Sequence, residues 1–145
     1  QSIVIKNEVV KNDPKELGER KLLNFGHTLG HAIESYFLKQ KIEKKLLHGE
    51  AIAVGMILES FISVRLNDLS LNEANYIAKS ITKIYTKIEF LNSEIAAIIS
   101  LVRYDKKNIK GENRFTLLSK IGEANINNSV SVKLMELAFD MYKSS

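Results

Sequence analysis

The stretch NFGHTLGHAIE, residues 24–34, lies inside a longer segment whose apolar residues recur at helical spacing. Over 20–38 this periodicity predicts one amphipathic helix with a core face. The polar side chains share the opposite face, within about 40° of Arg20 at roughly 100° per residue: Asn24, His27, His31 and Glu34. The segment therefore predicts a helix that packs through one side and presents these polar groups on the other.

Two glycines, Gly26 and Gly30, lie four residues apart on a third side of this predicted helix. Each costs about 1 kcal/mol relative to alanine inside a helix, so a compensating contact is expected. Close approach of another backbone is the simplest such contact. Residues 50–66, EAIAVGMILESFISVRL, are apolar on nearly every face at their start and predict a buried central helix.

All three histidines of the chain lie within 22 residues, at positions 27, 31 and 48. His27 and His31 are one helical turn apart and could reach one divalent metal, although a polar stripe that merely faces water has the same spacing. His48 lies just ahead of the predicted buried helix, where it could reach a cleft from a loop, cap the helix or be a core residue. Neutral imidazoles suit zinc, which takes three protein ligands at a catalytic site, so a carboxylate is the natural third ligand.

The rest of the chain predicts further helices and one small β element. SLNE at 70–73 is a capping box that opens a helix. The predicted elements are an extended strand over 2–10, a helix start at 13–16, helices over 70–87, 92–104 and 131–143, a polar loop over 105–113, and a hairpin formed by 114–122 and 124–130. The predicted fold class is mainly α, a single multihelical domain over 1–145 with at most a small β-hairpin.

Composition argues against several classes of function. The chain has no cysteine, so it has no disulfide and no thiolate ligand, which fits a reducing cytoplasm. It has no run of about eighteen apolar residues, so we expect no membrane span. The lysine clusters at 39–45 and 106–110 lack interleaved aromatic residues, which argues against a nucleic-acid partner. With a net charge of only +4, these clusters fit either a solvated surface or a site for a small anionic ligand.

Three motifs in a fixed order resemble the C-terminal, mostly helical domain of the 3-dehydroquinate synthase family. They are IKNEVVKNDPKELGERKLLNFGHTLGHAIE (5–34), HGEAIAVGM (48–56) and DKKNIKGENRFTLLSKIG (105–122). The resemblance covers nearly the whole chain, although the segment between His31 and His48 is a few residues longer than is typical of the family. It implies the C-terminal half of a two-domain enzyme whose N-terminal NAD-binding domain is absent from this chain, which has no G-x-G-x-x-G loop.

The resemblance implies roles for particular residues. His27 and His48 match the zinc-ligand positions, and His31 matches a catalytic histidine that contacts the substrate and takes part in proton transfer. The remaining matches are substrate-binding positions: Lys6 and Arg20, which suit a carboxylate, Asn24, and Lys106 or Lys107 near the substrate phosphate. Glu16 matches a further acidic position in the active-site region.

By this resemblance, the intact enzyme converts 3-deoxy-arabino-heptulosonate 7-phosphate to 3-dehydroquinate and phosphate in the shikimate pathway. The implied cofactors are NAD and a divalent metal, zinc or alternatively cobalt. NAD, a catalytic lysine and the glutamate that is the third zinc ligand belong to the missing half, so the chain alone is expected to be inactive. The expected partners are the anionic sugar-acid phosphate, the N-terminal domain and, at full length, a second subunit in a cytoplasmic homodimer.

Two alternatives stay open. A related sugar-phosphate cyclase or a metal-dependent dehydrogenase would share the two-domain plan. Lys6 and Arg20 discriminate here, because a substrate without a carboxylate has no use for that pair. A stand-alone helical metal-binding or interaction module would instead have no Rossmann-like half upstream.

Overall fold

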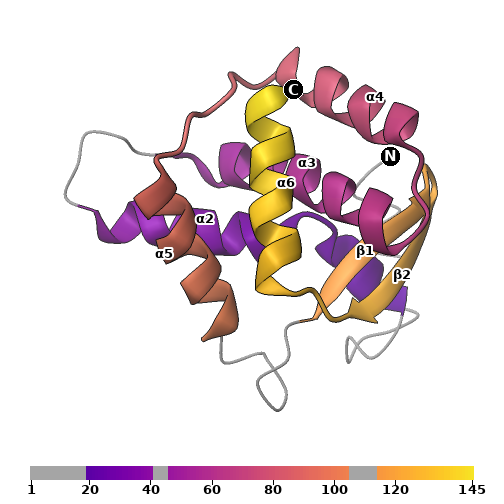
Figure 1. Cartoon of the computed structure of the whole chain (residues 1–145), viewed down its shortest axis with the longest axis horizontal. Coiled ribbons are helices and arrows are strands. Elements are labelled where there is room, and N and C mark those ends of the chain that lie inside the picture. The colour runs from indigo at the N-terminus through magenta and orange to yellow at the C-terminus, as the bar shows by residue number, and fades with distance from the viewer. Residues whose placement is uncertain (1–18, 41–45, 105–113) are drawn as a thin grey trace.

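A central helix, α3 (His48–Leu66), organises the fold, and the other elements pack around it (Figure 1). The computed structural model describes residues 19–40, 46–104 and 114–145. Within these residues the remaining elements are η1 (Glu19–Asn24, a 3-10 helix), α2 (His27–Lys39), α4 (Leu71–Thr82), α5 (Asn92–Arg103), β1 (Phe115–Lys120), β2 (Glu123–Asn128) and α6 (Val132–Ser144). The prediction of a mainly α, multihelical domain with one small hairpin is confirmed. The strand, helix start and loop predicted over 2–10, 13–16 and 105–113 lie outside the described residues.

Helix α3 is buried on most of its circumference because α2, α4, α6 and the hairpin all contact it. Its apolar side chains form the centre of the core, and Ile57, Leu58, Phe61 and Ile62 are each at most 2% exposed. Burying each such side chain contributes about 1.5–3 kcal/mol relative to an exposed one. Figure 1 shows α6 crossing in front of α3. The predicted central helix is confirmed, with its start two residues earlier than expected, at His48.

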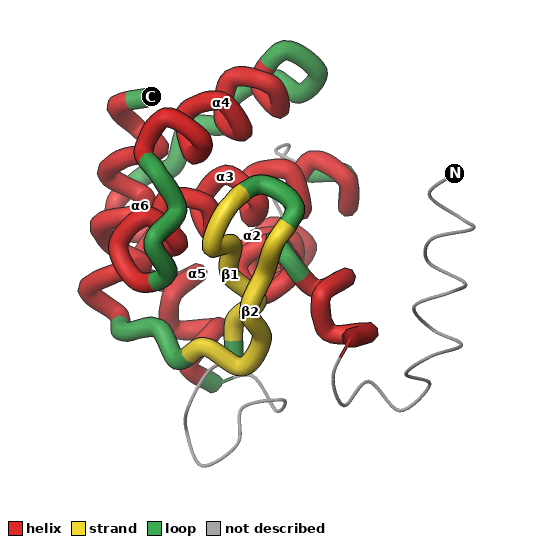
Figure 2. The backbone as a smooth tube through the Cα atoms, turned by 90° about the vertical axis from the view of Figure 1, so that its right-hand side faces the viewer, coloured by secondary structure: helices red, strands yellow, loops and turns green. Residues whose placement is uncertain are grey.

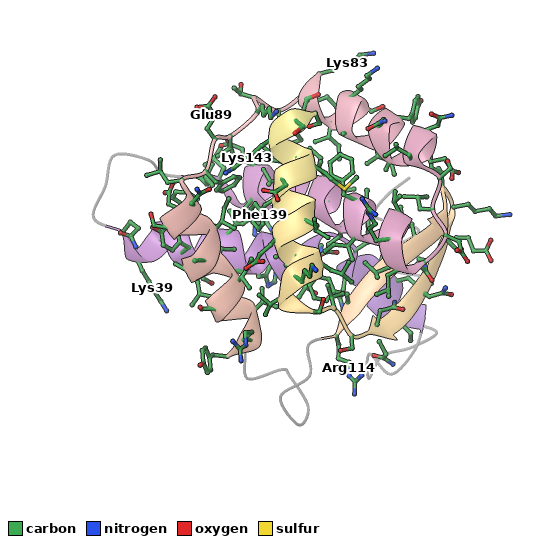
Figure 3. All side chains as sticks on the ribbon, in the orientation of Figure 1. Lys39, Lys83, Glu89, Arg114, Phe139 and Lys143 are labelled. Carbon is green, nitrogen blue, oxygen red and sulfur yellow. The ribbon has the colours of Figure 1, made fainter. Side chains whose placement is uncertain are left out.

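The core is apolar, whereas charged side chains project from the edge of the molecule. Phe139 of α6 is completely buried, whereas Lys39, Lys83 and Arg114 project outward (Figure 3). None of the described helices is both long and apolar enough to cross a membrane.

Helices α2 and α3 approach each other closely through glycine residues. A Cβ atom added to Gly55 of α3 would meet the Gly26 carbonyl oxygen and would lie 2.7 Å from the Gly30 nitrogen. One added to Gly30 would lie 3.0 Å from the Cα atom of Ile52. The predicted compensation for helical glycine is therefore present, since the missing side chains allow two backbones to touch.

The prediction of one continuous helix over 20–38 is wrong. The 3-10 helix η1 ends at Asn24, Gly26 takes a left-handed conformation with φ of 84°, and α2 begins at His27. The break is stabilised by α3, because the buried Glu59 carboxyl accepts hydrogen bonds from the Gly26 N–H at 2.6 Å and the Leu29 N–H at 3.1 Å. Asn24 and the backbone of Arg20 therefore belong to η1. The predicted polar face is shared only by the residues of α2, which are His27, His31 and Glu34.

Two of the outer helices, α4 and α6, begin at serines that the sequence places at their starts. Ser70 accepts a hydrogen bond from the Glu73 N–H at 3.1 Å, and the Glu73 carboxylate accepts one from the Ser70 N–H at 3.3 Å. This reciprocal pair is the predicted capping box at the start of α4. Ser131 likewise accepts a hydrogen bond from the Leu134 N–H at the start of α6. Helices α4 and α6 therefore start within one residue of their predicted positions, and α5, whose N-cap Leu91 makes no side-chain cap hydrogen bond, starts at its predicted residue.

Helix α4 ends at Thr82, five residues before its predicted end at 87. Beyond it the chain turns over 83–85 and then has no regular secondary structure up to 91, and this segment places Ile88 and Phe90 in the core. Tyr142 of α6 holds this segment, because its hydroxyl accepts from the Ile88 N–H and donates to the Ile88 carbonyl, both at 2.9 Å. The long-range contact with α6 thus overrides the local preference for a longer helix.

The two strands form the predicted antiparallel hairpin, which lies beside η1 and α3 (Figure 2). Gly122 in its turn has a φ of 92°, a conformation that glycine adopts without strain. The hairpin is attached to α3 by Ser63, whose hydroxyl accepts a hydrogen bond from the Leu118 N–H at 3.0 Å and donates to the Glu59 carbonyl at 2.7 Å.

Gly55→Ala should destabilise the chain strongly, because the new methyl group would collide with the backbone of α2. Overpacking typically costs about 1–3 kcal/mol, and backbone atoms yield less than side chains do. Urea unfolding monitored by circular dichroism measures the free energy of unfolding. Gly49→Ala is the matched control, because a Cβ atom there would meet only the Tyr85 hydroxyl at 3.6 Å. Equal stability of the two variants would contradict the glycine contact.

The stability of the chain should also depend on pH through Glu59. Burial raises the pKa of its carboxyl to about 8 from 4.5, although nearby backbone N–H groups, chiefly those of Leu29 and Gly26, lower it. Between these two values the folded chain holds a proton that the unfolded chain releases, so the free energy of unfolding falls as pH rises, by up to about 1.4 kcal/mol per pH unit.

Glu59→Gln cannot titrate and should lack this contribution. Urea unfolding of both proteins from pH 5 to pH 8 measures the difference in their free energies of unfolding, in which titrations common to both cancel. The wild-type advantage should shrink as pH rises. A difference that stays constant over this range would refute the raised pKa.

Candidate metal centre

The three histidines of the chain meet at one place on the surface. Their ring centroids are 5.3 Å apart for His27 and His31, 6.4 Å for His27 and His48, and 5.8 Å for His31 and His48. Each offers one ligand nitrogen, and these nitrogens all lie within 4.8 Å of one another. His27 is half-buried, whereas His31 and His48 are exposed. Within the described residues, this is the one group of three or more such side chains that could hold a metal ion.

The helix crossing explains why residues so far apart in sequence meet. Helices α2 and α3 run in opposite directions past each other, since Gly26 lies against Met56 and Gly30 lies against Ile52. His27 and His31 are on successive turns of α2, and His48 is the first residue of α3. His48 is therefore part of the helix rather than of the preceding loop from which it was predicted to reach.

Two of the rings are held by hydrogen bonds at the Nδ1 atom. His27 Nδ1 lies 3.2 Å from the Phe25 carbonyl oxygen, and His48 Nδ1 lies 2.8 Å from the Glu34 carboxylate. With its proton on Nδ1, each ring donates to this oxygen and keeps the Nε2 lone pair for a metal. Metal-ligating histidines commonly show such a second contact, which fixes the tautomer and the ring orientation.

The donor set fits zinc or cobalt in its chemistry. Imidazole nitrogens suit both metals, and the chain has no cysteine that would offer a thiolate instead. Tetrahedral zinc with Zn–N bonds of about 2.0–2.1 Å separates its ligand atoms by about 3.3 Å. Side-chain rotations that bring the nitrogens up to about 1.5 Å closer would therefore close the site around an ion.

The structure places only some of the other predicted site residues. Asn24 is half-buried in η1, two residues before the break at Gly26. The side chain of Arg20 lies outside the part that the structure describes, as do four complete residues: Lys6, Glu16, Lys106 and Lys107. Thr28 Oγ1 of α2 donates to the Arg114 carbonyl at 3.2 Å, so the first described residue after 105–113 lies next to the first turn of α2.

Two acidic residues at the site were not assigned a role from sequence. Glu34 belongs to the polar face of α2, but its contact with His48 depends on the helix crossing. Glu59 interrupts the apolar run of α3, and a carboxyl in such a run is a signal for a buried polar contact. The sequence contains this signal but does not reveal the hydrogen-bonding partner of the Glu59 carboxyl, which is the start of α2.

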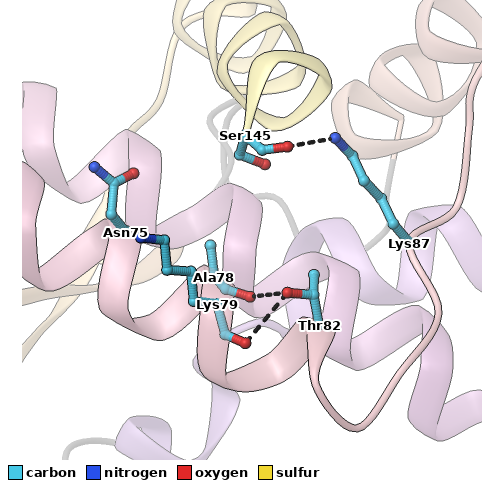
Figure 4. A pocket seen from close by; sticks show the side chains of 6 residues that line it. All are labelled: Asn75, Ala78, Lys79, Thr82, Lys87 and Ser145. Atoms are coloured by element: carbon cyan, nitrogen blue, oxygen red, sulfur yellow. Dashed lines mark hydrogen bonds between the residues drawn. The ribbon is translucent and has the colours of Figure 1, made fainter.

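A pocket lies away from the histidines. It has a volume of about 160 Å³ and is lined by Asn75, Ala78, Lys79, Thr82, Lys87 and Ser145 (Figure 4). The Lys87 ammonium group donates to the carbonyls of Lys143 and Ser145 at 3.1 and 2.8 Å, so it is already engaged by the end of the chain. This pocket therefore offers no chemistry comparable to that of the histidine cluster.

The sequence and fold match known proteins. The family model described as 3-dehydroquinate synthase C-terminal matches residues 1–108. The 3-dehydroquinate synthases of Parabacteroides distasonis and Acinetobacter baylyi are each 38% identical to the chain, over 100% and 95% of it. The chain spans only 40% and 37% of the length of these relatives.

Solved structures give the same fold. The 2-deoxy-scyllo-inosose synthase solved with carbaglucose-6-phosphate, NAD+ and Co2+ superposes with a TM-score of 0.78 at 25% identity, over 96% of this chain and 38% of that one. The 2-epi-5-epi-valiolone synthase of Streptomyces hygroscopicus, solved with NAD+ and Zn2+, has a TM-score of 0.72 at 22% identity, over 94% of this chain and 37% of that one. The matched family model and the curated relatives establish that the chain belongs to the 3-dehydroquinate synthase C-terminal family.

Proposed function

We propose that the chain is the metal- and substrate-binding part of a 3-dehydroquinate synthase. The longer protein would convert 3-deoxy-arabino-heptulosonate 7-phosphate to 3-dehydroquinate and phosphate, a phosphate-eliminating lyase reaction. The observation that carries the proposal is the meeting of three histidines across α2 and α3 in a chain of this family. Because the chain spans about 40% of a curated relative, NAD and the third metal ligand would belong to a preceding domain, and the chain alone would be inactive.

His27 and His48 would hold the metal, with His31 as the proton-transfer residue beside it. The Nδ1 contacts of His27 and His48 suit the ligand role of these two residues, because each ring is oriented by an oxygen behind it. His31 is exposed one turn along the same face of α2, where it could exchange protons with a bound substrate. The metal, when bound, would polarise substrate oxygens and favour their negatively charged forms.

The remaining predicted residues would bind the two anionic ends of the substrate. Lys6 and Arg20 would take the carboxylate with Asn24 nearby, and Lys106 or Lys107 would take the phosphate. At full length the protein would act as a homodimer.

A related sugar-phosphate cyclase is the second candidate, because the solved neighbours are such enzymes. The curated relatives favour the dehydroquinate reaction, since they are 38% identical against 25% or less for the solved neighbours. A turnover assay of the full-length protein with substrates that carry or lack the carboxylate separates the two. Turnover of the carboxylate-free sugar phosphate alone would contradict the synthase proposal.

Alanine substitutions in the full-length protein test the division among the histidines. His27→Ala and His48→Ala should lose the metal, whereas His31→Ala should keep it and lose turnover by about 10²–10⁴-fold, as expected for a general acid–base group. Elemental analysis gives the metal content, and steady-state kinetics gives kcat and kcat/KM. Lys79→Ala, an exposed substitution on α4, is the control and should change neither quantity. A folded but metal-free His31→Ala protein would instead make all three histidines ligands.

Glu34→Gln should weaken metal binding by about 10–100-fold, because outer-shell partners of ligating histidines have effects of this size. Titration of the 145-residue chain with Co2+, followed by visible absorption, measures the affinity. Glu50→Gln is the matched control, because it removes the same charge two residues after His48 while its carboxylate bonds the Leu47 N–H instead. Equal weakening in the two variants would indicate a general effect of charge rather than the Glu34–His48 hydrogen bond.

A further inference from the structure

Glu59 is the most completely buried acidic residue near the histidines. It is 0% exposed in the middle of α3, and its two carboxyl oxygens accept separate hydrogen bonds from the Gly26 and Leu29 N–H groups. Both donors belong to the first turn of α2, on either side of His27 in sequence. A buried carboxyl is costly unless hydrogen-bonded, so this pair of bonds is the condition under which Glu59 is tolerated in the core.

The first N–H groups of α2 need a hydrogen-bond acceptor from another element, because α2 has no side-chain cap of its own. The first N–H groups of a helix lack intrahelical partners and are usually satisfied by a serine, threonine, aspartate or asparagine cap. The N-cap of α2 is Gly26, which has no side chain and makes no cap hydrogen bond. A side chain there would collide with Met56 of α3, so the close helix contact itself excludes a local cap.

We propose that Glu59 is a positioning residue for the histidine cluster. It lies on the same helix as His48, and its carboxyl is hydrogen-bonded to the turn that contains His27. It therefore fixes where α2 begins relative to α3. The separation of the His27 and His48 rings then follows from one rigid helix and two hydrogen bonds. This inference rests on the proposed metal site for its consequence in the enzyme, but the geometry of the rings tests it without any metal.

Ser63 provides a matched comparison on the same helix. One turn after Glu59, it is also 0% exposed and also ties α3 to another element, but that element is the hairpin, through the Leu118 N–H. Ser63→Ala therefore removes this buried long-range hydrogen bond, together with the local one to the Glu59 backbone carbonyl, and lowers stability while leaving the bonds of the Glu59 carboxyl to the start of α2 in place. If Glu59 contributed only to stability, substitutions at Glu59 and at Ser63 would affect the histidines in the same way.

The test compares Glu59→Gln with Ser63→Ala in the 145-residue chain, which has only three histidines. Glutamine keeps one acceptor oxygen but turns an N–H₂ group toward one of the two backbone donors. The first readout is the set of three histidine ring-proton NMR signals in metal-free protein, at temperatures where thermal unfolding shows each variant to be folded. Glu59→Gln should shift the His27 signal, and Ser63→Ala should leave all three in place.

The second readout is Co2+ affinity by visible absorption. We expect at least about a tenfold loss for Glu59→Gln and no change for Ser63→Ala. Glu59→Asp, which keeps the carboxyl but is too short to reach both donors, is used if Glu59→Gln does not fold and should give the same two changes. A wild-type chain that binds no Co2+ would show that the metal needs the third ligand of the preceding domain, and the NMR comparison would then decide the role of Glu59. Unchanged histidine signals in a destabilised Glu59 variant would overturn the positioning role.

Discussion

Direct contact between the backbones of α2 and α3 is the constraint on which the rest of the structure depends. Gly26, Gly30 and Gly55 remove the side chains that would otherwise hold the two helices apart. The two helices can then pass each other closely enough for the first turn of α2 to reach Glu59, and for His48 to reach Glu34. In a helix pair at the ordinary spacing of about 8–10 Å between axes, these polar groups would be too far apart to form their hydrogen bonds.

This close contact changes how polar groups are satisfied in the interior. The glycine that permits the contact also deprives α2 of a side-chain cap, so the N–H groups of its first turn bond to a carboxyl from the neighbouring helix. Burial raises the pKa of that carboxyl, which shows that the backbone donors offset only part of its desolvation. The core thus contains an acidic group whose partners are two helix-terminal N–H groups rather than a cation.

The histidine cluster is a product of the same geometry. Its rings lie at the surface, with His31 and His48 exposed, and two of them are oriented from behind by oxygens of Phe25 and Glu34. Under the proposed function, such a face would bind a metal and an anionic substrate while remaining accessible to another part of a larger protein. The fraction of the relatives that the chain spans, about 40%, agrees with a site completed by residues elsewhere.

Local sequence patterns determined most of the secondary structure. The caps at Ser70 and Ser131 act over three residues, so α4 and α6 start within one residue of the predicted positions. The apolar run of α3 predicts that helix with its start two residues too late. Tertiary structure alone decided the break at Gly26, the end of α4 at Thr82 and the contacts of Glu34 and Glu59. Helical periodicity over 20–38 gave no sign of the break, because the groups that stabilise it are about thirty residues away in sequence. The sequence identified the three histidines as candidate site residues, but only the crossing of α2 and α3 brings His48 close to the other two.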